Sequence, residues 1–158
     1  MSVKYLLSIS IALACILCYC LPIRIGYNSD LSYMGCLLYS FFHANIFHLA
    51  VNLVALWRFI PRIHTACVAY VCAVVTAALP FTAISEDTYG LSAFLFAAYA
   101  RRYVAWKQSV GLLIGIQLAL ALLPHINWKA HLCAFLMSYS YWRVFYGRKR
   151  QNATGRTA

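Results

Sequence analysis

Long apolar runs separated by short polar segments make up most of the chain. Apolar runs of about 20 residues are typical of helices that cross a lipid bilayer. The fourth run is too short to cross about 30 Å of hydrocarbon at about 1.5 Å per residue, so other helices must surround it. The pattern predicts an all-α membrane protein, a bundle of six transmembrane helices with a short central fourth helix. The expected helices are residues 4–22, 37–57, 64–84, 90–103, 108–123 and 128–146.

The composition agrees with a membrane domain, because 64% of the 158 residues are hydrophobic, too many for one water-soluble core. Residues 1–147 are expected to form one transmembrane domain, since no Gly-, Ser- or Pro-rich linker divides them. Residues 148–158 are expected to form a short, basic, flexible cytoplasmic tail. The first helix also has features of a cleaved signal peptide, but its apolar run is longer than most signal cores, which favours retention.

The charges predict an orientation in the membrane. The formal net charge is +10, and the Lys and Arg residues lie between the apolar runs. This placement favours membrane orientation over nucleic-acid binding. With a cytoplasmic N-terminus, eleven of the 13 basic residues fall inside and only Arg24 and Lys129 fall outside. The imbalance predicts that both termini are cytoplasmic. The seven cysteines lie mostly in apolar runs, which indicates small hydrophobic residues and not disulfides or metal ligands.

Unusual polar residues fall at one depth of the predicted bundle. His43, His48 and Asn52 lie at the outer end of the second helix. Ser92 opens the fourth helix and His131 opens the sixth, both from the outer side. Each residue alone is compatible with hydrogen bonds that hold helices together. Because polar groups at that depth are costly, their convergence favours a functional site.

The polar set contains the groups that acyl transfer requires. A serine hydroxyl is a poor nucleophile until a base takes its proton, and neutral imidazole is such a base near pH 7. No acid is placed to orient His131, so a Ser92–His131 dyad is the simplest arrangement. His48, Asn52 and the backbone N–H of Ser92 are candidate donors to an oxyanion. Gly90 allows the loop backbone to approach the reacting atoms closely.

Three segments carry a resemblance to a known family. HANIFHLAVN, YGLSAFLFAAYARR and KAHLCAFLMS resemble, in order and spacing, the motifs of the rhomboid intramembrane serine proteases. The resemblance covers about residues 36–146. It implies an intramembrane serine endopeptidase that cleaves transmembrane protein substrates within the lipid bilayer, without a metal or cofactor. It also implies six helices with both termini in the cytoplasm.

The resemblance assigns roles to individual residues. Ser92 matches the nucleophile and His131 the general base. His48 and Asn52 match the side chains of the oxyanion hole, with backbone help around Leu91. The supporting positions are His43, Gly90 and Phe96, the last of which matches an aromatic residue that packs on the base.

The chain also departs from the family pattern. Ala93 and Ala134 stand where the family commonly has glycine, and each methyl group adds thickness between the fourth and sixth helices. The first outer loop, residues 23–35, is shorter than in many members and lacks their Trp-Arg pair.

Other functions fit parts of the pattern. A catalytically inactive relative that binds transmembrane helices is one alternative, although such relatives typically lose the serine or histidine. A small transporter using His and Asn is disfavoured, because the polar groups cluster near one face of the membrane. A purely structural role leaves the dyad as coincidence. The expected location is a bacterial plasma membrane, with the active site open to the outer side; the sequence does not indicate an oligomeric state.

Overall fold

The computed structural model describes residues 3–30, 32–59, 61–84, 86–106 and 126–154. These residues form helices and no strand, with one isolated β-bridge between Tyr27 and Thr88. The all-α prediction is confirmed, and the expected helix at 108–123 lies outside the described residues. The elements are α1 (Val3–Cys20), α2 (Tyr33–Leu38), the 3₁₀ helix η1 (Tyr39–Phe41), α3 (Ile46–Phe59), α4 (Ile63–Ala77), the 3₁₀ helix η2 (Pro80–Thr82), α5 (Ser92–Trp106) and α7 (Trp128–Thr154).

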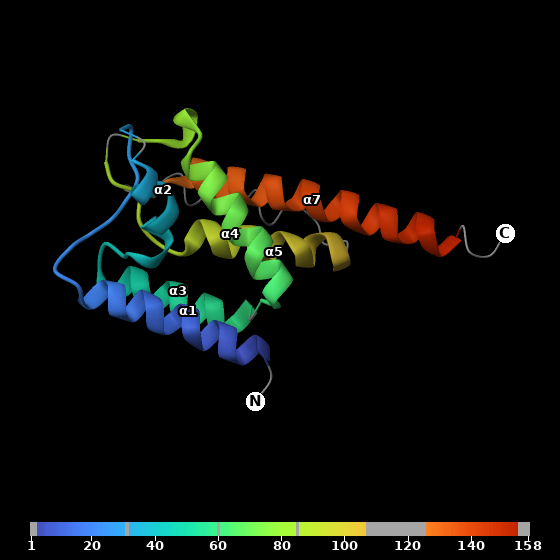
Figure 1. Ribbon diagram of the computed structural model, residues 1–158, viewed down its shortest axis with the longest axis horizontal. Helices are drawn as coiled ribbons and strands as arrows, with labels where there is room; N and C mark the ends of the chain where they lie inside the picture. Colours follow the sequence, from blue (N-terminus) through green and yellow to red (C-terminus); the bar gives the residue numbers. More distant parts are fainter. Residues whose placement is uncertain (1–2, 31, 60, 85, 107–125, 155–158) are drawn as a thin grey trace.

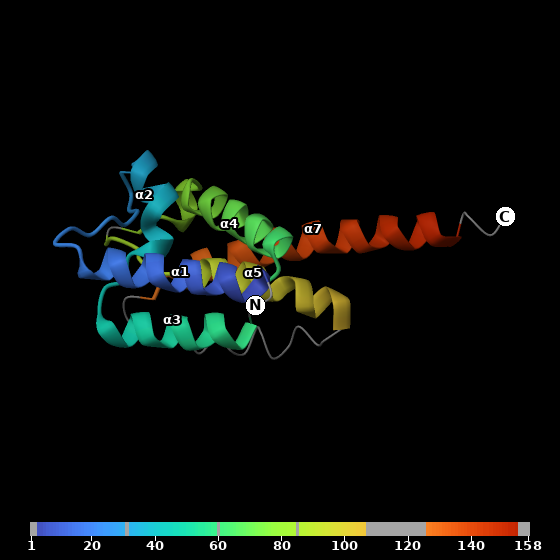
Figure 2. The same ribbon diagram turned by 60° about the horizontal axis from the view of Figure 1, so that its bottom comes forward.

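Helix α5 lies at the centre of the bundle. It packs most extensively against α7, then against α4 and α3, while α1 packs against α3 (Figure 1). The N-terminal ends of α5 and α7 lie at the same end of the molecule, and α7 runs past the bundle towards the C-terminus (Figure 2). The predicted central helix is therefore packed among three other helices. It spans Ser92–Trp106 and not residues 90–103, and with 15 residues it is as long as α4.

Small residues bring α5 and α7 together. Ala93 and Ala97 of α5, and Ala130 and Ala134 of α7, are at most 1% exposed. One hydrogen bond, from Ser138 Oγ to the carbonyl oxygen of Ala97 at 2.7 Å, joins the same two helices. Alanine is thus small enough for a close approach between these helices, even at the two positions where the family commonly has glycine.

The expected helix at 37–57 is instead broken into two parts. The segment Tyr33–Phe41 and helix α3 meet at an angle of 73°. Asn45 is the reason, because its side-chain Oδ1 accepts the N–H of His48 at 2.9 Å and caps the start of α3. Phe42 is accordingly extended, with φ −92° and ψ 148°. The bend places His43 between the two helical parts.

Within the described residues, no single helix is both long and apolar enough to cross a membrane. The bent pair passes that test of length and composition when its two parts are taken together, and the segments Tyr5–Cys20 and Ile63–Ala77 are apolar but shorter.

Two other helix boundaries differ from the expectation. Helix α4 ends at Ala77 and not near residue 84, because Pro80 cannot continue it and Thr82 Oγ1 donates to the carbonyl of Thr76 at 2.6 Å. The tail after Gly147, expected to be flexible, is helical as far as Thr154. Its Arg, Lys and Gln residues have high helix propensity. The prediction of a flexible tail rested on charge alone and left this propensity out.

Candidate active site

The side chains of Ser92 and His131 are in contact. Ser92 is the first residue of α5, and His131 lies in the first turn of α7. Ser92 Oγ and His131 Nε2 are 2.7 Å apart, although the residues are 39 positions apart in sequence. Ser92 is half-buried, whereas His131 is 8% exposed. When the hydroxyl donates, Nε2 accepts, and the imidazole proton is then on Nδ1.

Phe96 holds the plane of the His131 ring. It lies one helical turn after Ser92, and its ring stacks on the imidazole with centroids 4.9 Å apart and an interplanar angle of 17°. His131 Nδ1 is buried and has no hydrogen-bond partner within the described ranges. Stacking and the serine contact therefore orient this imidazole, and no described carboxylate takes part.

Gly90 brings the backbone before Ser92 against the His48 ring. Its φ of +109° is strained for a residue with a side chain, and its N–H donates to the carbonyl of Tyr39 at 3.0 Å. A Cβ added to Gly90 would lie 2.5 Å from Cε1 of His48 and 3.3 Å from Nδ2 of Asn52. A glycine is therefore required here, and both predicted oxyanion residues face the turn that leads to Ser92.

Asn52 keeps an unpaired donor beside this turn. The residue is 4% exposed, and no described group accepts a hydrogen bond from its Nδ2. A buried donor without a partner costs about 1–3 kcal/mol. Unpaired groups of this kind in a folded protein call for a functional explanation. A negative charge that develops near Ser92 would supply the missing acceptor.

His43 has a structural position behind the turn. It is fully buried, and its Nδ1 lies 3.3 Å from the carbonyl oxygen of Phe41. Because Nδ1 donates there, Nε2 is free to accept the N–H of Leu91 at 3.5 Å. The Leu91 N–H, expected in the oxyanion hole, is thus directed at His43. The first N–H groups of α5, beginning with Ser92, are the backbone donors that remain, since a helix leaves them without intrahelical partners.

Three residues that shape the site have no role predicted from the sequence. Asn45 caps α3 and sets the direction of His48, and the carbonyl of Tyr39 holds Gly90. Asn127 precedes α7 and caps it, with Oδ1 accepting the N–H of Ala130 at 3.2 Å. An asparagine directly before an apolar helix is a known signal for a cap, and this signal was present at both Asn45 and Asn127.

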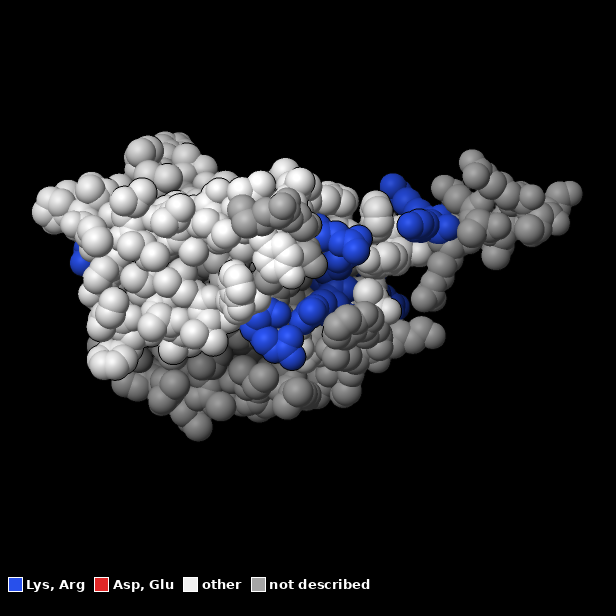
Figure 3. Space-filling model, turned by 90° about the horizontal axis from the view of Figure 1, so that it is seen from below, with Lys and Arg blue, Asp and Glu red and all other residues white. Residues whose placement is uncertain are grey.

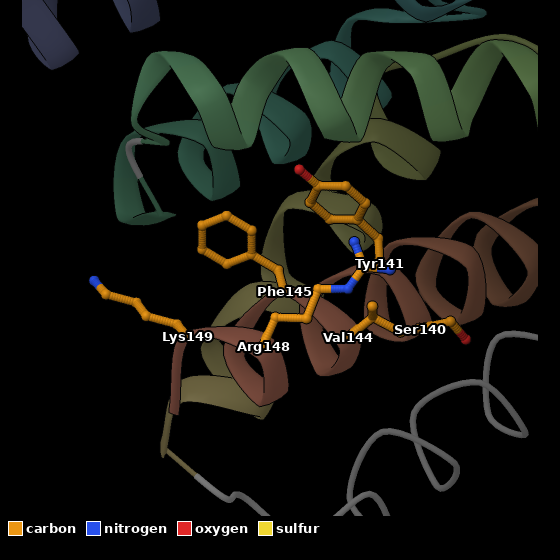
Figure 4. A pocket seen from close by; sticks show the side chains of 6 residues that line it. All are labelled: Ser140, Tyr141, Val144, Phe145, Arg148 and Lys149. Carbon is orange, nitrogen blue, oxygen red and sulfur yellow. The ribbon is translucent and has the colours of Figure 1, made fainter. Parts of the chain in front are cut away.

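A pocket elsewhere in the structure is remote from this chemistry. It lies along the C-terminal half of α7, more than two helical turns after His131, and contains none of the residues discussed above (Figure 4). In the described part of the chain, no group of three or more His, Cys, Asp or Glu side chains has an arrangement suited to a metal ion. The residues that line the pocket are Ser140, Tyr141, Val144, Phe145, Arg148 and Lys149.

Comparison with known families decides the relationship. The family model of the rhomboid domain matches residues 31–148. The chain belongs to the rhomboid family. Rhomboid proteins are integral membrane proteins and are generally serine proteases, and the matched range contains every residue described above around Ser92 and His131. No curated protein and no solved structure matches the chain.

Proposed function

We propose that this rhomboid-family chain is an intramembrane serine endopeptidase. The observation that carries the proposal is the 2.7 Å contact between Ser92 Oγ and His131 Nε2. A hydroxyl within hydrogen-bond distance of an imidazole is the arrangement of an activated nucleophile. A buried unpaired donor at Asn52 beside the same serine adds the second requirement, stabilisation of a developing negative charge.

The first half of the reaction forms an acyl-enzyme. Ser92 Oγ attacks the carbonyl carbon of the scissile peptide bond while its proton passes to Nε2 of His131. The carbon becomes tetrahedral and its oxygen carries the negative charge. The protonated His131 then gives that proton to the leaving amine nitrogen as the C–N bond breaks. One product leaves with a new N-terminus, and the other remains esterified to Ser92.

The second half of the reaction regenerates the serine. Water attacks the ester carbonyl while His131 Nε2 takes a proton from it, and the same imidazole returns the proton to Ser92 Oγ as the ester bond breaks. The second product leaves as a carboxylic acid. Phe96, stacked on His131, keeps the imidazole in one orientation through both halves.

Three donors are proposed to stabilise the oxyanion. These are Nδ2 of Asn52, the imidazole of His48 and the N–H of Ser92 at the start of α5. The helix dipole of α5 adds a partial positive charge at the same point. A single such donor contributes roughly 2.7–4 kcal/mol to transition-state stabilisation in a soluble protease.

The distribution of charge supports an outward-facing site. On the face shown in Figure 3, Lys and Arg gather towards the side where α7 leaves the bundle, apart from a small basic area at the opposite edge, and no described Asp or Glu is visible. Ser92 and His131 lie at the other end of α5 and α7. Since basic residues favour the cytoplasmic side, the proposed active site opens to the outer side. The proposed substrates, transmembrane proteins, rest on membership of the rhomboid family and not on the charges.

A fluorophosphonate probe tests the proposal. The purified full chain in detergent should be labelled covalently, and Ser92→Ala and His131→Ala should remove the labelling. Ser140→Ala, which removes an exposed serine elsewhere on α7, should leave it unchanged. Labelling that survives Ser92→Ala, or a parent chain that is folded and unlabelled, contradicts the protease. The second result favours the inactive relative that binds transmembrane helices.

A further inference from the structure

Asn127 is a buried junction between segments that are distant in sequence. It is 6% exposed and directly precedes α7. Its Nδ2 lies 2.8 Å from the carbonyl oxygen of Thr82, 3.0 Å from Thr88 Oγ1 and 3.1 Å from the hydroxyl of Tyr27. Its Oδ1 accepts the N–H of Ala130 at 3.2 Å. One side-chain amide therefore holds the first loop, η2, the segment before α5 and the start of α7.

Two of these contacts lead directly to the reacting residues. Thr88 lies four positions before Ser92, and its backbone pairs with Tyr27 through bonds of 2.8 and 3.2 Å. On the other side, Ala130 is the residue before His131, whose own N–H is 3.4 Å from the carbonyl of Asn127. The same amide thus ties down the backbone that carries the hydroxyl and the backbone that carries the imidazole.

We propose that Asn127 is a positioning residue that sets the contact between Ser92 Oγ and His131 Nε2. It touches neither reacting atom and acts through Thr88 on one side and Ala130 on the other. The inference rests on the proposed protease function for its kinetic consequences, whereas the effect on the contact between Ser92 and His131 does not depend on activity.

Two roles of the amide are separable by substitution. Asn127→Asp keeps an oxygen that caps α7 but removes both amide hydrogens. The Thr82 carbonyl then loses its donor, while the hydroxyls of Thr88 and Tyr27 can only donate to the carboxylate. Asn127→Ala removes both. Thr88→Val removes only the acceptor on the Ser92 side and keeps the shape of the side chain. Ser138→Ala is the matched control, because it removes a buried 2.7 Å bond between the same two helices, about two turns beyond His131.

The first measurement is the rate of fluorophosphonate labelling, separated into probe affinity and maximal rate. Asn127→Ala and Asn127→Asp should both lower the maximal rate, by up to about 100-fold, because a displacement of about 1 Å has that effect on a reacting pair. Probe affinity should not change. Thr88→Val should give a smaller decrease, and Ser138→Ala should label at the parent rate. If Asn127→Ala keeps the parent rate, or if Thr88→Val and Asn127→Asp both keep it, the amide does not position the reacting residues and the proposal is overturned.

The second measurement does not depend on activity. The side-chain ¹⁵N signals of His131, assigned by their loss in His131→Ala, report the bond to Ser92, which Ser92→Ala removes. The Asn127 variants should move the Nε2 signal towards its position in Ser92→Ala, whereas Ser138→Ala should not. Parent-like signals in folded Asn127 variants overturn the inference even when the parent chain is unlabelled. If the Asn127 variants do not fold, Thr88→Val decides alone, and a parent rate with a parent-like signal overturns it.

Discussion

The two ends of the α5–α7 pair are held together by different interactions. At the Ser92 end, directional hydrogen bonds fix polar side chains, and the buried donor of Asn52 has no described partner. At the other end, aromatic rings surround Trp142, which is 1% exposed. The ring of His64 lies 5.3 Å from it and that of Phe145 5.4 Å, while the Arg101 guanidinium lies 5.3 Å above it. The end with Ser92, His131 and Asn52 is the polar end, and the end with the rings around Trp142 is the aromatic end.

The difference indicates where function and stability are located. Unpaired buried donors and a glycine with positive φ lower stability. Trp142 Nε1 at the aromatic end is also buried without a described partner, so it is the unpaired donor together with the strained Gly90 beside Ser92 that distinguishes the polar end. Ring packing raises stability, since it contributes dispersion and about 0.5–1.5 kcal/mol for a well-oriented aromatic pair. Substitutions at the polar end should therefore remove activity from a folded protein. Those at the aromatic end should unfold the protein without changing the chemistry.

The largest expected effect separates two histidines, one from each end. His131→Ala should lower peptide cleavage by about 10⁴-fold or more, because serine and base act as a unit. His64→Ala should leave the rate close to that of the parent, since His64 Nε2 contacts only the Tyr141 hydroxyl, at 3.1 Å, among the described hydrogen bonds of that end. Cleavage of a transmembrane substrate by both variants, at equal folded concentration, checks the comparison. A comparable loss in His64→Ala means that the ends are coupled in catalysis.

The second effect concerns stability. Trp142→Ala should lower the free energy of unfolding by about 3–5 kcal/mol, the usual cost of removing a large buried aromatic side chain. The control is Trp57→Ala, because Trp57 is 62% exposed on α3 and should matter little. Thermal unfolding in detergent compares the two. The folded fraction of Trp142→Ala should still bind the fluorophosphonate probe at the parent rate, and a slower rate contradicts the separation of the two ends.

At the polar end, some features of the structure could be predicted from the sequence and others could not. Ser92 and His131 were expected to lie near each other because each opens a predicted helix from the same side, and their side chains are 2.7 Å apart. The bend before α3 was missed, since an apolar run predicts a continuous helix and the capping oxygen of Asn45 overrides it. Such local side-chain bonds to the backbone compete with helix and do not show in hydrophobic periodicity.

The partners of buried polar groups were the least predictable feature. Leu91 was expected to serve the oxyanion, but its N–H faces His43, which depends on a ring orientation fixed by the carbonyl of Phe41. The four contacts of Asn127 join segments up to 100 positions apart. Periodicity reports which face of a helix is buried, not which atoms meet across the bundle. The packing of rings at the aromatic end was likewise not predicted, because it joins two helices, α4 and α7, that are distant in sequence.

The third effect tests the unpaired donor. Asn52→Ala should lower cleavage by about 10²–10³-fold, equivalent to roughly 2.7–4 kcal/mol in the activation barrier. This is the effect of removing one oxyanion donor from a soluble serine protease. It should not lower thermal stability, because the buried Nδ2 has no described partner to lose. Asn45→Ala removes the cap that precedes the same helix, so it should lower stability by about 1 kcal/mol and have a smaller effect on turnover. A clear drop in the stability of Asn52→Ala means that the amide is structural.

The smallest effect concerns the alanines between α5 and α7. Ala134→Gly restores the residue that the family commonly has, yet it should not raise cleavage, because Ser92 and His131 are already 2.7 Å apart. It should lower stability by about 0.5–1 kcal/mol, the cost of glycine in a helix. Ala100→Gly, equally buried at the aromatic end, should lose a similar amount. Measuring both variants separates backbone freedom from helix spacing. A severalfold rise in cleavage for Ala134→Gly alone means that its methyl group holds the imidazole away from the serine, and the close pairing at the polar end is then not the reactive one.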